Sequence, residues 1–136
     1  MTQTSLTDTQ INEGLQLLNR LARAEVPMLG AAWVKESESG DWYIYIVTPL
    51  VDPDGATRPA YQRINGVLRD MVNEGFQVDP FAKKVFSPQS PIGKDIIANC
   101  ERDSGKFLLS LPSGLGGLDV AEVYVYPISY FSGKQN

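Results

Sequence analysis

Four tyrosines on two apolar stretches are the side chains best suited to binding chemistry. Tyr43 and Tyr45 lie in one stretch, and Tyr124 and Tyr126 lie in the other. Residues two apart in an extended strand project from the same face, so each pair should share a face. If the two strands are neighbours and their faces coincide, the four phenols form one flat patch. We therefore take these tyrosines as the candidate interaction face.

Such a patch has three interpretations. A helix can cover it, it can contact another protein or a second copy, or it can stack a ligand such as single-stranded nucleic acid, because tyrosine combines an apolar ring with a polar tip. The chain carries 12 Lys and Arg against 16 Asp and Glu, a formal net charge of −4. Since that balance repels a phosphate backbone, nucleic acid is a disfavoured partner, and single-stranded nucleic-acid binding on the Tyr-rich sheet face is kept as a further alternative function.

The segment 52–58 offers a second constellation. Asp52 and Asp54 stand two apart and are followed by Gly55, as in loops that bind calcium. Arg63 occupies the position at which such a loop requires a glutamate. We therefore predict a solvated turn and no metal site. A small enzyme or small-molecule binder using Asp and Tyr groups near 52–58 remains the alternative function.

Catalytic machinery is sparse. The chain has no histidine, so it cannot use a Ser-His or Cys-His pair, and its single cysteine, Cys100, is expected to be a buried apolar residue. The Gly-rich stretch 113–117 lacks the Lys-Ser/Thr of a phosphate-binding loop, which predicts a turn. We assign no catalytic residue and expect no cofactor. Four basic residues could form a modest patch for an acidic partner, although such residues more often form a solvated face. They are Lys83, Lys84, Lys94 and Arg102.

Hydrophobic spacing predicts the elements that position these residues. Apolar residues recur at helical intervals, with capping and proline signals at the ends, in three segments. Extended apolar runs between them indicate strands. The fold class is therefore α+β, with an antiparallel or mixed sheet of about four or five strands and about three helices packed on it. The expected helices are 7–24, 59–75 and one from 91 to near 103–105, and the expected strands are 28–35, 42–48, 81–86, 107–111 and 120–127.

The hairpin formed by 28–35 and 42–48 leads to the predicted function. Gly30, Ala31 and Ala32 are small, which predicts close approach of a neighbouring element. The strand 42–48 is apolar on both faces, and we expect it to need more cover than three short helices supply. We therefore predict a non-enzymatic protein-interaction module, self-associating through an apolar or aromatic sheet face or edge. Its partner would be a second copy, as in a homodimer, or another protein.

The length of 136 residues corresponds to one domain. We expect a frayed segment at 1–6, a single α+β domain over 7–128 and a tail at 129–136. No stretch is long and apolar enough to span a bilayer, and the amino terminus lacks the basic and apolar regions of a signal peptide. Together with a lone thiol, these features predict no membrane association and a cytoplasmic location.

Several segments carry a resemblance. The segments 31–36, 42–52, 60–61, 79–81 and 124–127 look like those of a group of small bacterial single-domain proteins of unknown function. The resemblance implies a bacterial, intracellular, single-domain protein and implies no activity.

Overall fold

A computed structural model describes residues 8–38, 40–51, 56–75, 83–102, 107–109, 117 and 120–126, with side chains at all of these except 101, 102, 107–109 and 121. The helices are α1 (Asp8–Arg23), α2 (Arg58–Asn73) and α3 (Pro91–Arg102). The strands are β1 (Gly30–Glu36), β2 (Trp42–Val47), β3 (Lys83–Phe86), β4 (Phe107–Leu109) and β5 (Val120–Val125). The predicted α+β class is confirmed.

The five strands form one open sheet in the order β3-β2-β1-β5-β4. The predicted hairpin of β1 and β2 is antiparallel, and β1 also pairs with β5 in antiparallel fashion. After β2 the chain passes through α2 and returns as β3, which runs parallel to β2. The sheet is therefore mixed, and the hairpin lies at its centre.

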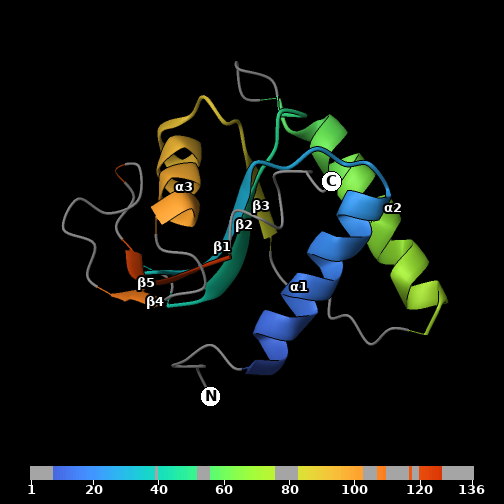
Figure 1. Cartoon of the computed structure of the whole chain (residues 1–136), viewed down its shortest axis with the longest axis horizontal. Coiled ribbons are helices and arrows are strands. Elements are labelled where there is room, and N and C mark those ends of the chain that lie inside the picture. Colours follow the sequence, from blue (N-terminus) through green and yellow to red (C-terminus); the bar gives the residue numbers. More distant parts are fainter. Residues whose placement is uncertain are drawn as a thin grey trace.

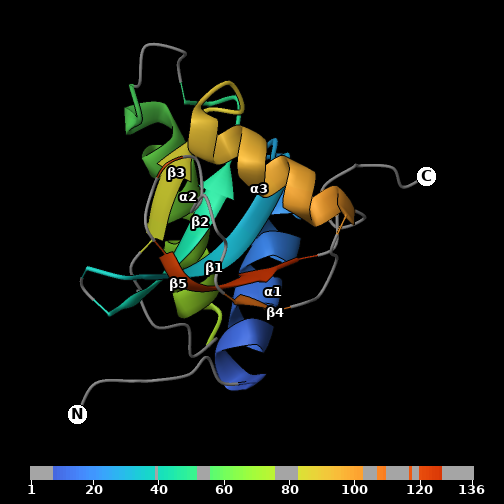
Figure 2. The same ribbon diagram turned by 90° about the vertical axis from the view of Figure 1, so that its left-hand side faces the viewer.

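Helices cover the sheet from both sides. Figure 1 shows α3 on one side of the strands and α1 with α2 on the other. Figure 2, turned by 90°, shows α3 in front of the sheet. The molecule therefore has three layers, and we call the two sides of the sheet the α3 face and the α1–α2 face.

On the α3 face, Gly30 of β1 allows α3 to pack close to the sheet. A Cβ atom built there would lie 3.2 Å from Ile96 Cγ2 and 3.5 Å from Cys100 Sγ, so the helix sits close to the strand backbone. The Cys100 thiol is buried and donates to the Ala31 carbonyl oxygen at 3.5 Å. The predicted close approach at the small residues and the predicted burial of Cys100 are both confirmed.

On the α1–α2 face, Gly14 of α1 leaves space for the side chains of Trp33 and Tyr126. A Cβ atom there would overlap the Tyr126 hydroxyl and lie 3.0 Å from Trp33 Nε1. The Trp33 indole donates to the Tyr126 hydroxyl oxygen at 3.0 Å, and that hydroxyl donates to the Ile11 carbonyl oxygen at 2.8 Å. Both side chains are buried, so α1, β1 and β5 are joined through one buried hydrogen-bonded chain.

The expectation that β2 needs cover from a second copy is wrong. Trp42 and the four residues from Ile44 to Val47 are buried within a single chain, and only Tyr43 is partly exposed. Helices on both sides, together with flanking strands, already shield the strand. Among the described residues, the exposed large hydrophobic side chains are the isolated Leu29 and Val72. Scattered apolar residues of this kind are normal on a protein surface.

The helix ends follow the predicted signals where they are described. Ser90 caps α3, since its hydroxyl oxygen accepts from the Gly93 amide at 3.0 Å, and Pro91 is the first helical residue. Gly75 follows the end of α2 with φ at +95°. The first residue of the predicted helix 7–24, the segment 1–6 and the tail 129–136 lie outside the described residues.

None of the described helices combines the length and apolar character needed to cross a bilayer.

Candidate functional site

The four tyrosines of the predicted patch do not share a face. Trp33 of β1 pairs with Ile44 on one side and with Tyr124 on the other. Directly opposed residues project from the same face of a sheet, so Tyr124 lies on the face of Ile44 and Trp33. Tyr43 flanks Ile44 and therefore lies on the opposite, α3 face. Because β1 separates β2 from β5, the two tyrosine pairs occupy opposite faces and form no single patch.

Two of the four tyrosines serve the core. Tyr45 is 0% exposed and Tyr126 is 1% exposed. Tyr126 belongs to the hydrogen-bonded chain through Trp33, and its ring meets that of Tyr124 edge-on with centroids 5.4 Å apart. Tyr43 and Tyr124 are half-buried. Little phenol surface is left for a partner on either face.

Tyr45 belongs instead to a polar cluster on the α3 face. Its hydroxyl donates to Glu36 Oε2 in a short hydrogen bond, and Lys84 Nζ donates to the same oxygen at 2.8 Å. The Lys84 ammonium also lies 4.6 Å from the centre of the Tyr43 ring. We call Glu36, Tyr43, Tyr45 and Lys84 the Glu36 cluster. Its members come from β1, β2 and β3, so it ties the edge strand β3 to the centre of the sheet.

The protonation states of Glu36 and Tyr45 follow from their burial and contacts. Burial, with the hydrogen bond to Glu36 and the charge of that carboxylate, raises the pKa of Tyr45 far above its ordinary value. Burial opposes ionisation of Glu36, but hydrogen bonds from Lys84 and Tyr45 outweigh it and lower the pKa of Glu36. The phenol therefore stays neutral and the carboxylate stays charged at neutral pH. Proton transfer is favoured by a pKa near the working pH, so this arrangement suits structural or binding roles better than acid–base catalysis.

Sequence reasoning missed Glu36 and grouped the lysines differently. Lys83 pairs with Ile44 and Lys84 with Tyr45, so the two lysines project from opposite faces. Lys83 instead lies 6.0 Å from the Tyr61 ring centre on α2, and burial lowers its pKa. Lys94 is exposed on α3, and the side chain of Arg102 is not described. The available sequence signal was the acidic Glu36 at the end of an apolar run, just before a polar turn. In the structure β1 shifts its register with β5 at this residue.

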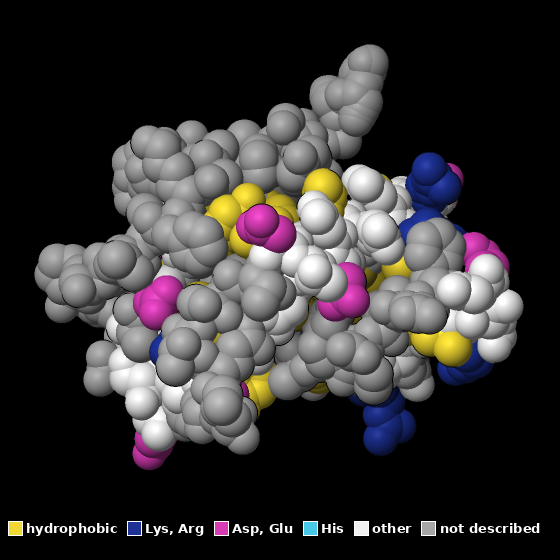
Figure 3. Space-filling model, turned by 90° about the horizontal axis from the view of Figure 1, so that it is seen from below, with side chains coloured by type: hydrophobic (Ala, Val, Ile, Leu, Met, Phe, Trp, Pro, Cys, Tyr) yellow, Lys and Arg dark blue, Asp and Glu magenta, His cyan; other side chains and the backbone are white. Residues whose placement is uncertain are grey.

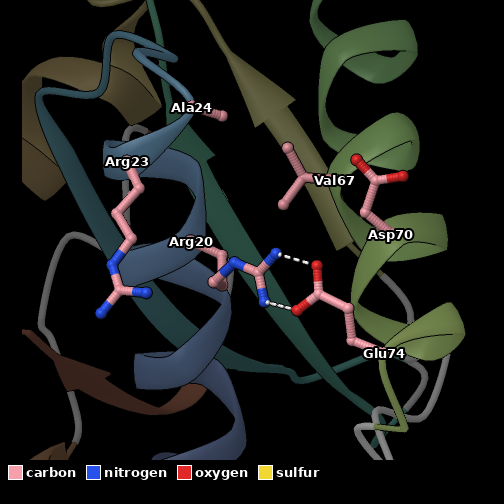
Figure 4. A pocket seen from close by; sticks show the side chains of 6 residues that line it. All are labelled: Arg20, Arg23, Ala24, Val67, Asp70 and Glu74. Atoms are coloured by element: carbon pink, nitrogen blue, oxygen red, sulfur yellow. Dashed lines mark hydrogen bonds and ion pairs between the residues drawn. The ribbon is translucent and has the colours of Figure 1, made fainter.

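A second site is a charged groove between α1 and α2. It has a volume of about 330 Å³, and Figure 4 shows its lining. Arg20 spans the groove with two hydrogen bonds to the Glu74 carboxylate, at 2.6 and 2.7 Å. The groove is lined by Arg20 and Arg23 of α1 with the following Ala24, and by Val67 and Asp70 of α2 with its C-cap residue Glu74.

The two walls of this groove carry opposite charges. Its ionic side chains on α1 are cationic, and those on α2 are anionic. The hydrogen bond with Glu74 raises the pKa of Arg20, and the same contact lowers the pKa of Glu74. Figure 3 shows that both basic and acidic side chains are present at its right-hand side, the side on which α2 lies in Figure 1. The groove therefore presents a cationic wall and an anionic wall, and a surface with the two charges in the reverse order would be complementary to it.

Three further candidates from the sequence are the turn near 52–58, the Gly-rich stretch 113–117 and Cys100. Within the described ranges, no three acidic or cysteine side chains gather closely enough to hold a metal ion. The turn at 52–55 and the stretch 113–116 lie outside those ranges. Burial of Cys100 removes its thiol from solvent.

Comparison with protein-family models, curated proteins and solved structures yields no match.

Proposed function

We propose that this protein is a non-enzymatic protein-interaction module that self-associates. The α1–α2 groove is the observation that carries this proposal, because its cationic and anionic walls lie side by side on one surface. A surface that carries both charges in separate rows can match a second copy of itself. The protonation states of the Glu36 cluster support a non-catalytic role.

The association surface differs from the one predicted from the sequence. Tyr45 and Tyr126 are already buried within one chain, so the sheet faces offer little apolar area to a partner. At the β3 edge, the Tyr61 hydroxyl donates to the Lys83 carbonyl oxygen at 3.3 Å, and two lysines stand in the four-residue strand. Short edge strands rich in lysine disfavour pairing with another sheet. These features favour the helical layer as the contact surface.

Sedimentation velocity over a concentration series tests self-association. We expect the weight-average sedimentation coefficient of the wild-type protein to rise between low micromolar and near-millimolar concentration. We expect added salt to weaken the association, because exposed charge pairs are screened. A monomer at every concentration and salt level would overturn the proposal.

A cytoplasmic location and a bacterial origin belong to the same proposal. The buried lone thiol suits a reducing compartment, in which cysteines remain unpaired. Fractionation of cells expressing the full chain tests the location. Recovery in the membrane or secreted fraction would contradict it.

A further inference from the structure

We propose that the α1–α2 groove is the contact surface between two copies of this chain, arranged so that α1 of each copy lies over α2 of the other. This inference rests on the proposed self-association and specifies its geometry. The required two-fold axis runs along the groove, in the plane of contact. In a two-fold contact the same residues meet twice, so each favourable pair counts twice.

The charges on the two walls of the groove determine this arrangement. Arg20 and Glu74 already satisfy one another across the groove. Arg23 and Asp70 stand on opposite walls. Neither forms a hydrogen bond or close ion pair with the described part of the chain; each acts within its own copy only through its charge, Arg23 on Glu74 and Asp70 on Arg20. In Figure 4 they lie on the two sides of the Arg20–Glu74 bridge. Rotation about the groove axis brings Arg23 of one copy toward Asp70 of the second copy, and the reverse pair forms by symmetry.

The charge distribution favours the crossed arrangement, with α1 over α2, over the arrangement in which α1 of one copy lies over α1 of the other. If α1 of one copy lay over α1 of the other, Arg20 and Arg23 would face their own counterparts. Like charges placed together cost free energy, whereas the crossed arrangement places unlike charges together. Ala24 and Val67 supply apolar contact between the two charged rows. With a net charge of −4 on each copy, long-range repulsion keeps the association modest and makes the local pairs decisive.

Charge reversal tests the crossed pairing. Arg23→Glu places two acidic groups together, and Asp70→Arg places two basic groups together. We expect each single variant to weaken self-association about tenfold or more, because two symmetric pairs turn from attractive to repulsive. Both positions bear charges on the groove surface, so circular dichroism and thermal unfolding should show a fold like that of the wild type.

Mixing the two variants provides the sharper test. In an equimolar mixture, Glu at position 23 of one variant meets Arg at position 70 of the other, and the native pair forms on the opposite side. We therefore expect the mixture to associate with near wild-type affinity as a heterodimer, measured by sedimentation velocity. The double variant Arg23→Glu/Asp70→Arg should likewise recover homodimerisation.

Matched controls carry the same charge changes elsewhere. Arg69→Glu changes an exposed residue of α2 that does not line the groove, and Glu38→Arg changes an exposed residue after β1. Both controls should associate much as the wild type does. A wild-type dimer unaffected by either groove variant would place the contact on another surface and overturn this inference while self-association stands. Weakened single variants without rescue in the mixture would overturn the crossed geometry. A monomeric wild type would instead overturn the proposed function itself.

Discussion

At the scale of single residues, several buried polar side chains have definite partners that link distant segments, whereas the buried Trp42 indole N–H has no partner among the described residues. The Tyr126 hydroxyl accepts from Trp33 and donates to the backbone of Ile11, and Gly14 leaves the space that this arrangement requires. Glu36 accepts from Tyr45 and Lys84. Leaving a buried donor without its partner costs about 1–3 kcal/mol, so these contacts restrict substitution at each position.

Gly14→Ala should lower the free energy of unfolding by about 1–3 kcal/mol, because the added methyl group overlaps the Tyr126 hydroxyl. The matched control is Gly66→Ala in α2, where an added Cβ meets nothing within 4 Å. That control should raise stability by about 0.5–1 kcal/mol, since alanine favours a helix over glycine. Urea denaturation measures both changes. A smaller loss for Gly14→Ala in a Tyr126→Phe background would confirm that the hydroxyl is the obstacle, and equal losses would contradict it.

Glu36 should make stability fall in acid. The folded chain holds its pKa below the ordinary value of 4.5, so its contribution is fully present above that pH. The contribution is lost as pH falls through the lowered pKa, because the unfolded chain binds the proton more readily. We expect Glu36→Gln to flatten the acid limb of urea stability plotted against pH. The exposed Glu38→Gln should leave the limb nearly unchanged. Equal effects of the two variants would argue against a stabilising role for the Glu36 carboxylate.

At the scale of elements, the amino-terminal ends of α2 and α3 show whether a residue type suited to capping forms a cap hydrogen bond. Ser90 caps α3 with its side chain and also donates to the Ser87 carbonyl oxygen at 2.6 Å. Thr57 precedes α2 and has a residue type suited to capping, but its side chain forms no cap hydrogen bond. The same kind of residue therefore stabilises one helix directly and contributes little to the other.

Ser90→Ala should lower the free energy of unfolding by about 1 kcal/mol, because it removes an N-cap hydrogen bond. Thr57→Ala is the matched control and should change stability by much less, since no cap bond is lost. Thermal unfolding followed by circular dichroism compares the two. A loss at Thr57 equal to that at Ser90 would show that the cap bond is not the cause.

At the scale of the whole molecule, the three layers bury the central strand β2 without help from another chain. Both sides of β2 are buried in one copy, and the α3 face and the α1–α2 face are each covered by helices. Folding should therefore be separable from association. In an obligate dimer, by contrast, the folded state depends on protomer concentration.

We expect the thermal unfolding midpoint to stay constant as the protein is diluted below the range in which dimers form. The physical reason is that the core of one chain is already complete. Calorimetry or fluorescence over a dilution series measures the midpoint. A steady fall on dilution throughout the monomer range would show that a partner completes the core, and would contradict the single-chain cover of β2.

The sequence by itself determined features that depend on near neighbours in the chain. These include the three helices, the hairpin, the burial of Cys100 and the assignment of each tyrosine pair to one face of its own strand. Helical and strand periodicities arise from local backbone geometry, so a pattern of apolar residues reveals them.

Only the tertiary structure decided which strands are neighbours. The placement of β1 between β2 and β5 puts the two tyrosine pairs on opposite faces, and it does so through contacts about 90 residues apart in the chain. Glu36 meets Lys84 across 48 residues, and Arg20 meets Glu74 across 54. Such meetings depend on how the whole chain packs, and no local spacing encodes them. For this reason the sequence pointed to a tyrosine surface, whereas the folded chain offers a charged groove between two helices.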